Sequence, residues 1–204
     1  MILSATCILA ISFAYAFARY VVLGPVAPAQ IPVFLLNKGF AMAAVVFLFC
    51  AAVSHAVRRP ENARSWGTAA LHCGTLHALL SFTILSSAYF PALFEGERMS
   101  LRGELTVCFG VLAVYGSWLL RRDGLRSTAK KLLQLLSTLA IAGHLIALGS
   151  ARWLDAAGWY GGMPPISLIS LLFVMACLLL FLTGAGPSMP RTASRSTNAR
   201  ETIV

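Results

Sequence analysis

Charged residues are scarce in this chain. They make up 11% of its 204 residues, whereas a soluble domain carries about 25%. Hydrophobic residues make up 58%. This composition excludes an ordinary soluble domain and predicts an integral membrane protein, with lipid as its first partner. The net charge of +9 does not indicate nucleic-acid binding, because the basic residues fall in short loops and a tail, which is the pattern of membrane topology.

Acidic residues are scarcer still. The seven carboxylates lie in expected loops or in the tail, apart from Glu104 at the start of an apolar segment. No intramembrane acid pair is available for proton coupling, and no apolar segment is broken at its centre in a repeat-related way, so a transporter ranks last among the functions considered. No Gly-rich phosphate loop is present, and the sequence gives no support to hydrolysis or group transfer.

Six apolar segments are each close to the ~20 residues that cross a bilayer. They cover residues 2–23, 33–57, 66–93, 104–120, 130–150 and 165–184. Backbone groups in lipid must pair within the segment, so each is predicted to be a helix. We expect an all-α integral membrane protein, with a six-helix bundle over 1–184 and a disordered tail over 185–204.

The basic residues predict how this bundle is oriented. Eleven of the sixteen fall after the second segment, after the fourth segment and in the tail, and five fall on the opposite side. Both termini are therefore expected in the cytoplasm. We expect the membrane to be the inner (plasma) membrane of a bacterium.

Two histidines lie deep inside apolar segments, His77 in the third and His144 in the fifth. At ~1.5 Å per residue, both rings are expected ~15–21 Å from the same end of their helices. Ionisable side chains in lipid are costly and mark functional sites. Two at similar depth predict a ligand shared between helices, and a haem iron with two axial imidazoles is the natural candidate.

Small residues accompany both histidines. Gly74 and Ser81 share a helical face with His77, and Ala140 and Ala147 share one with His144. They would give a flat macrocycle room against the helices. The alternative is that they only allow tight helix packing.

The other two histidines, His55 and His72, are weaker candidates. His55 ends the second segment, and His72 is rotated ~140° around the helix from His77. A second haem between His55 and His72 is the alternative to a hydrogen-bonding role, and we expect one haem b. The five cysteines lie singly in separate segments and lack the spacing for covalent haem attachment.

Haem propionates favour basic partners, and the sequence leaves two sets open. The outer set is Arg19, Lys38, Arg98, Arg102 and Arg152, and the inner set is Arg64, Trp66 and Lys130.

The segments Leu76–Ser81, Ser87–Pro91, Ala142–Leu145, Trp153–Asp155 and Trp159–Leu168 resemble ferric reductase-like transmembrane proteins. This family includes haem-binding membrane subunits of periplasmic reductases. The resemblance implies a b-type cytochrome with His77 and His144 as iron ligands on the third and fifth helices. Two-haem members carry two histidines on each of these helices, and this chain departs from that pattern.

The resemblance therefore implies an electron-transfer subunit rather than a complete enzyme, with no catalytic residue of its own. Electrons would pass between a quinol, or a separate reductase, and an acceptor on the outer face, within a larger redox complex. The alternative is a structural membrane subunit that has lost the haem and whose interior histidines hydrogen-bond across helices.

Overall fold

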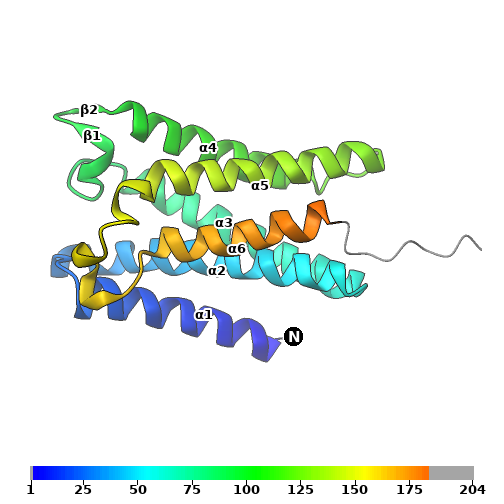
Figure 1. Cartoon of the computed structure of the whole chain (residues 1–204), viewed down its shortest axis with the longest axis horizontal. Helices are drawn as coiled ribbons and strands as arrows, with labels where there is room; N and C mark the ends of the chain where they lie inside the picture. Colours follow the sequence, from blue (N-terminus) through cyan, green and yellow to red (C-terminus); the bar gives the residue numbers. More distant parts are fainter. Residues whose placement is uncertain (1, 184–204) are drawn as a thin grey trace, which may run out of the picture.

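The computed structural model describes residues 2–183 of the chain, and the tail predicted over 185–204 lies outside them. Six α-helices run along the long axis of the molecule (Figure 1). They are α1 (Ile2–Phe17), α2 (Ile31–Ala56), α3 (Pro60–Thr83), α4 (Leu101–Leu119), α5 (Ser127–Gly149) and α6 (Ile166–Leu182). A π-helical segment, Ala18–Val22, continues α1, and a small antiparallel hairpin pairs β1 (Phe94–Glu95) with β2 (Arg98–Met99).

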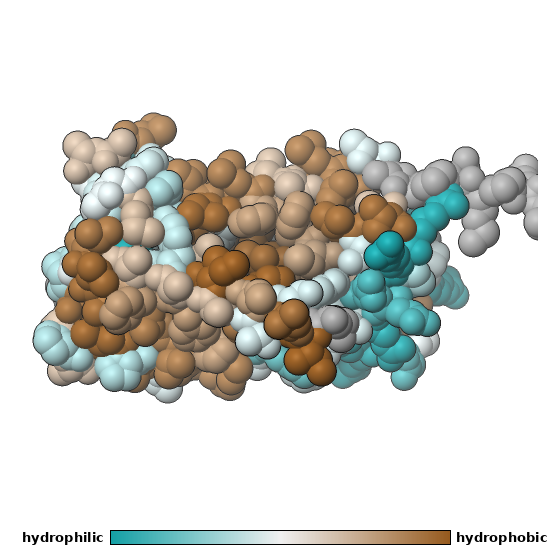
Figure 2. All heavy atoms as spheres, turned by 90° about the horizontal axis from the view of Figure 1, so that it is seen from below, coloured by the Kyte–Doolittle hydropathy of each residue, from teal (hydrophilic) through white to brown (hydrophobic). Residues whose placement is uncertain are grey.

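Four stretches are long and apolar enough to cross a membrane, as expected of an all-α membrane protein. They are Ile2–Val22, Pro28–Ala56, Ser127–Arg152 and Tyr160–Leu182. The stretches of α3 and α4 fall outside this group. Their first turns carry charged residues, such as Glu61 in α3 and Glu104 in α4. Apolar side chains cover much of the side of the bundle, and hydrophilic ones gather at one end (Figure 2).

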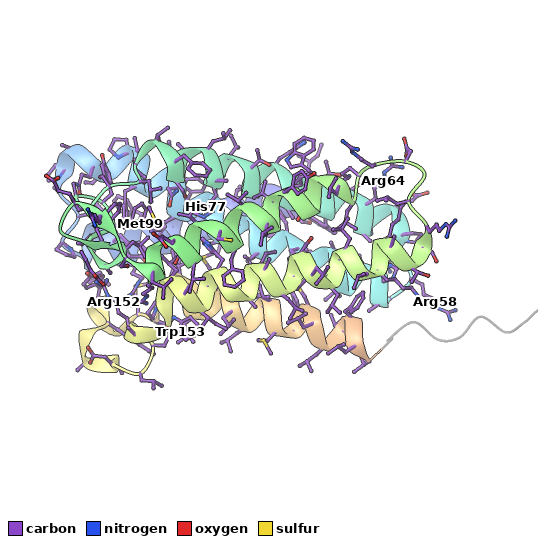
Figure 3. All side chains as sticks on the ribbon, turned by 90° about the horizontal axis from the view of Figure 1, so that it is seen from above. Arg58, Arg64, His77, Met99, Arg152 and Trp153 are labelled. Carbon is purple, nitrogen blue, oxygen red and sulfur yellow. The ribbon has the colours of Figure 1, made fainter. Side chains whose placement is uncertain are left out.

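The two ends of the bundle differ. Arg58 and Arg64 lie at one end, which we call the basic end, and Met99, Arg152 and Trp153 lie at the other, which we call the hairpin end (Figure 3). His77 lies in the half of the bundle nearer the hairpin end.

The second helix is the centre of the bundle. Its buried side chains enter three separate clusters, with Phe47 packed against α3, Val45 against α5 and α6, and Met42 against α1 and α6. The ring of Phe47 stacks on Trp66 of α3 with centroids 5.6 Å apart. The helices α1, α3, α5 and α6 are therefore arranged around α2, and α4 packs against α5 and α3.

Small residues set how closely the helices approach. A Cβ at Gly39 of α2 would lie 2.7 Å from the ring of Phe13 on α1, and a Cβ at Gly116 of α4 would overlap the hydroxyl of Ser137 on α5. Neither position tolerates a side chain without a shift. Close packing of small residues is the usual way in which helices associate in lipid.

The third helix differs from its predicted limits of 66–93, because it begins at Pro60 and ends at Thr83. Proline is tolerated at the first helical position, so the helix starts early. Beyond Thr83, residues 84–93 form turns and a short 3₁₀ helix, Pro91–Leu93. Ile84 and Leu93 are nevertheless buried. The apolar run therefore reflected burial of a folded loop rather than a continuing helix.

Candidate functional site

The rings of His77 and His144 face each other across the interior. Their centroids are 6.2 Å apart, and the ring planes are 80° to one another. Each histidine stands 17 positions after the first residue of its helix, α3 or α5, so the two rings lie at the same depth. This depth is about 26 Å from the start of each helix and about 8 Å from its end. His77 is thus nearer the end of its helix than the sequence predicted, whereas His144 lies at nearly the predicted distance from its helix end.

Each imidazole is held by a backbone carbonyl of a neighbouring helix. His77 Nδ1 lies 3.1 Å from the carbonyl oxygen of Asn37 on α2, and His144 Nδ1 lies 2.7 Å from that of Thr106 on α4. A carbonyl oxygen can only accept, so Nδ1 carries the proton in both rings. Nε2 is then the free nitrogen with a lone pair, which is the form in which histidine binds a metal.

The spacing of the rings fits an ion between them better than a direct hydrogen bond. A ring nitrogen lies about 1.2 Å from its centroid, so two metal–nitrogen bonds of about 2 Å separate the centroids by about 6.4 Å. A hydrogen bond between facing ring nitrogens would bring the centroids to about 5.3–5.6 Å. The observed 6.2 Å matches the first arrangement.

Both rings line one large cavity. Its volume is about 1620 Å³, and residues of α2 to α6 and of the π-helical segment Ala18–Val22 line it. Small-molecule sites usually occupy about 300–1,000 Å³, so this cavity has room for a large planar ligand. The cavity reaches from Arg19 and Arg152 near the hairpin end to His55 and Lys130 at the basic end.

Asn37 joins α2 to α3 through hydrogen bonds. It is fully buried, and its amide Nδ2 donates to Ser81 Oγ at 2.7 Å and to the His77 carbonyl at 3.2 Å. Ser81 Oγ also donates to that carbonyl at 2.8 Å. Together with the bond from His77 Nδ1 to the Asn37 carbonyl, these contacts fix the register of the two helices around the imidazole.

The predicted small residues divide into two groups. Gly74 and Ser81 line the cavity beside His77, whereas Ala140 and Ala147 do not line it. Ala140 is buried, and the carbonyl of Ala147 accepts a hydrogen bond from Arg102. On α5 the cavity is lined instead by residues one position further on, Ile141 and Leu148.

The two weaker histidines are not brought together. His72 is exposed on α3 and does not line the cavity, and His55 lines the cavity at its basic end. Among residues 2–183, no group of three or more His, Cys, Asp or Glu side chains is placed to hold a metal ion. Among the described residues, His77 and His144 are the histidines whose rings lie close to one another.

Two supporting residues of α4, Thr106 and Gly110, escaped the sequence analysis. Thr106 acts through its backbone carbonyl, which no sequence pattern reveals. A Cβ at Gly110 would lie 3.0 Å from Nδ1 of His144 and 3.4 Å from its Cε1. The missing side chain at Gly110 thus makes room for the ring, and a glycine inside an apolar helix was the available signal.

Replacing Gly110 with alanine is expected to displace the His144 ring by a few tenths of an ångström. Ligand geometry must be held within about 0.5 Å, so we expect roughly tenfold weaker haem binding, at the lower end of the effect of supporting residues. Thermal stability should not fall, because alanine favours a helix by about 1 kcal/mol over glycine. The control is Gly67→Ala, whose Cβ would meet only Arg121 at 3.8 Å. Equal haem affinities in a titration of both variants would contradict this role.

Arg102 binds backbone carbonyls at the C-terminal end of α5. From α4 it donates through Nε to the carbonyl of Ala147 and through Nη2 to that of Leu148, at 3.1 Å. Both carbonyls belong to the last turn of α5, where intrahelical donors run out.

Arg102→Ala is expected to destabilise the protein by about 1.5–3 kcal/mol, the contribution of hydrogen bonds to a charged group. Thermal unfolding in detergent, monitored by helical circular dichroism, measures this loss. Arg98→Ala is the control, because Arg98 is exposed on the same side and does not line the cavity. The same melting temperature for both variants would show that Arg102 does not hold the end of α5.

No protein-family model matches this chain, and no curated protein matches it at a significant level.

Proposed function

We propose that this chain is a six-span b-type cytochrome subunit that binds one haem b between His77 of α3 and His144 of α5. The observation that carries the proposal is the pair of imidazoles at equal depth, 6.2 Å apart, each with Nδ1 bound to a carbonyl. The likeness of its segments to ferric reductase-like membrane proteins supports the same assignment.

The residues around the cavity fit this group. Two imidazoles supply axial nitrogens, and a porphyrin supplies the other four ligands of its iron, which when bound carries one electron at a time. A structural zinc ion, in contrast, takes four protein ligands. The carbonyls of Asn37 and Thr106 orient the rings and raise their basicity, as partners of metal-bound histidine do. The apolar lining provides the low-dielectric surroundings that tune the potential.

The haemless structural subunit stays the second candidate. In a haemless subunit the interior histidines would hydrogen-bond across helices. Both do so, His77 to the carbonyl of Asn37 and His144 to that of Thr106. This candidate gives no reason for two histidines, each with Nδ1 bound to a carbonyl, to line one cavity of about 1620 Å³. Haem binding accounts for the hydrogen bonds, the spacing and the cavity together.

In this proposal all six helices cross a bacterial inner membrane. The basic end faces the cytoplasm with both termini, as the positive-inside rule expects, and the hairpin end faces outward. Electrons pass from a quinol or a separate reductase, through the haem, to an acceptor at the outer face. The chain is an electron-transfer subunit of a larger complex rather than a complete enzyme.

The depth of the histidines predicts an asymmetry in electron transfer. They lie about 8 Å from the hairpin ends of their helices and about 26 Å from the basic ends. In liposomes of uniform orientation, ferricyanide on the hairpin side should reoxidise reduced haem much faster than ferricyanide on the basic side. Stopped-flow absorbance measures both rates. Equal rates, or a faster rate from the basic side, would contradict transfer to an outer acceptor.

A further inference from the structure

Basic side chains gather in the cavity beside the two histidines. Arg19, Lys38 and Arg152, which we call the cationic cluster, line the cavity together with Arg102. Arg102 already donates hydrogen bonds to two backbone carbonyls at the end of α5. Asp155 is the single carboxylate that lines the cavity within residues 2–183, and its Oδ1 accepts from the backbone of Gly158 at 3.2 Å. The cluster therefore carries positive charge without a matching anion.

Lys38 is the member that adjoins the site in sequence. It follows Asn37, whose carbonyl holds His77, and it lines the same cavity as both imidazoles. Nζ lies 5.1 Å from the ring centroid of Phe34 and 5.0 Å from that of Phe90. No carboxylate within residues 2–183 pairs with it. A charge removed from water is costly unless an opposite charge accompanies it.

Arg19 adds a second uncompensated group. It is 4% exposed, and its guanidinium lies 5.4 Å from the centroid of Tyr20 and 5.2 Å from that of Tyr160. It donates through Nη1 to the carbonyl of Met163, while its Nε is buried without a partner. Arg19 belongs to the π-helical segment Ala18–Val22, and such segments are frequent at functional sites.

The two parts of the cluster are joined by aromatic rings. The ring of Tyr20, which faces Arg19, meets the ring of Phe34 edge-on with centroids 5.3 Å apart. Phe34 in turn faces Lys38. Arg152 lines the same cavity, and its side chain is exposed. A ligand with two negative charges at one edge would supply the acceptors that Arg19 and Lys38 lack.

We propose that the cationic cluster binds the two propionate carboxylates of the haem, with Lys38 and Arg152 as principal partners and Arg19 as a further donor. This inference rests on the proposed function. Carboxylates paired with Lys and Arg form strong charge-assisted hydrogen bonds. The propionate edge of the haem then faces the hairpin end. Of the two sets of partners that the sequence left open, this selects three members of the outer one.

The test compares two porphyrins on the full chain purified without haem. Iron protoporphyrin IX has free propionates, and its dimethyl ester has none. Each is titrated into the detergent-solubilised protein, and the binding constant is read from the shift of the main absorbance band. We expect the free acid to bind about tenfold more tightly than the ester.

The variants assign this difference to residues. Lys38→Gln should lose about tenfold in affinity for the free acid and nothing for the ester, and Lys38→Arg should restore the difference. Arg152→Gln provides the same test if Lys38→Gln does not fold. Arg98→Gln is the matched control, because Arg98 lies on the same side, outside the cavity, and it should leave both affinities unchanged.

The outcomes separate this inference from the function on which it rests. Equal affinities of the unaltered chain for the two porphyrins would overturn the propionate assignment while leaving haem binding intact. An equal loss for both porphyrins in Lys38→Gln would also overturn it, because it would reveal a general packing effect. If neither porphyrin binds, the proposed function fails and the assignment fails with it.

Discussion

Alanine at His144 or at His77 is expected to abolish haem binding by the purified protein. Each side chain is one of two nitrogen ligands in the proposed site, and the partner ring 6.2 Å away cannot replace it. Loss of a residue that only supports a ligand costs about 10–100-fold in metal affinity, and loss of the ligand itself should cost more. We expect the haem content to fall at least about tenfold in either variant, measured by absorbance of the reduced protein.

Two further substitutions distinguish loss of the ligand from loss of the fold. His144→Gln retains a side chain that can donate to the Thr106 carbonyl, so it should keep the helices in place while removing the imidazole. His72→Ala removes an exposed histidine of the same helix as His77 and should leave the haem content unchanged. If His77→Ala and His144→Ala each retained full haem content, the two residues would not be the iron ligands.

Asn37→Leu is the second substitution with a large expected effect. It removes the amide that donates to Ser81 Oγ and to the His77 carbonyl in a fully buried position. Loss of such buried bonds costs about 1–3 kcal/mol. Since α2 would no longer be fixed against α3 beside the imidazole, haem binding should weaken by about tenfold as well, in line with other supporting residues.

Thermal unfolding and a haem titration measure the two effects of Asn37→Leu separately. Asn62→Leu is the matched control, because Asn62 is exposed on α3 near the basic end. Asn37→Asp keeps the size of the side chain but removes both donors, so it should behave like the leucine variant or worse. Asn37→Leu with unchanged melting temperature and affinity would mean that the side chain does not hold the two helices together.

The number and order of the helices could be predicted from the sequence because apolar runs and basic loops are local patterns. The ends of the third helix could not. The run through residues 84–93 carries no charged side chain, yet it folds as turns and a short 3₁₀ helix, with Ile84 and Leu93 buried. Hydropathy measures transfer out of water and does not distinguish lipid from protein as the destination.

The pairing of His77 with His144 followed from their similar depth, and the structure brings the two rings together. The depth of His77 differs from the prediction, because α3 ends at Thr83 and brings the ring closer to the end of its helix. Ala140 and Ala147 were predicted to make room beside His144, but they do not line the cavity. Ile141 and Leu148 of α5 line it instead. Helical spacing places residues on a face, but the neighbouring helices decide what that face meets.

The partners of the imidazoles were beyond sequence analysis for a different reason. The acceptors are the backbone carbonyls of Asn37 and Thr106, and every residue has a carbonyl. Asn37 itself, a buried amide in an apolar helix, was a signal that could have been used. The basic residues Lys38 and Arg152 were visible as candidates, but only the fold shows that they line the same cavity as the histidines.

The most direct test of the account is the reduced-minus-oxidised absorbance spectrum of the purified full chain, together with its haem-to-protein ratio. We predict a b-type α band and one haem per chain. A folded, monodisperse protein that is colourless, even after haem is added to it, would contradict the proposal that His77 and His144 share an iron.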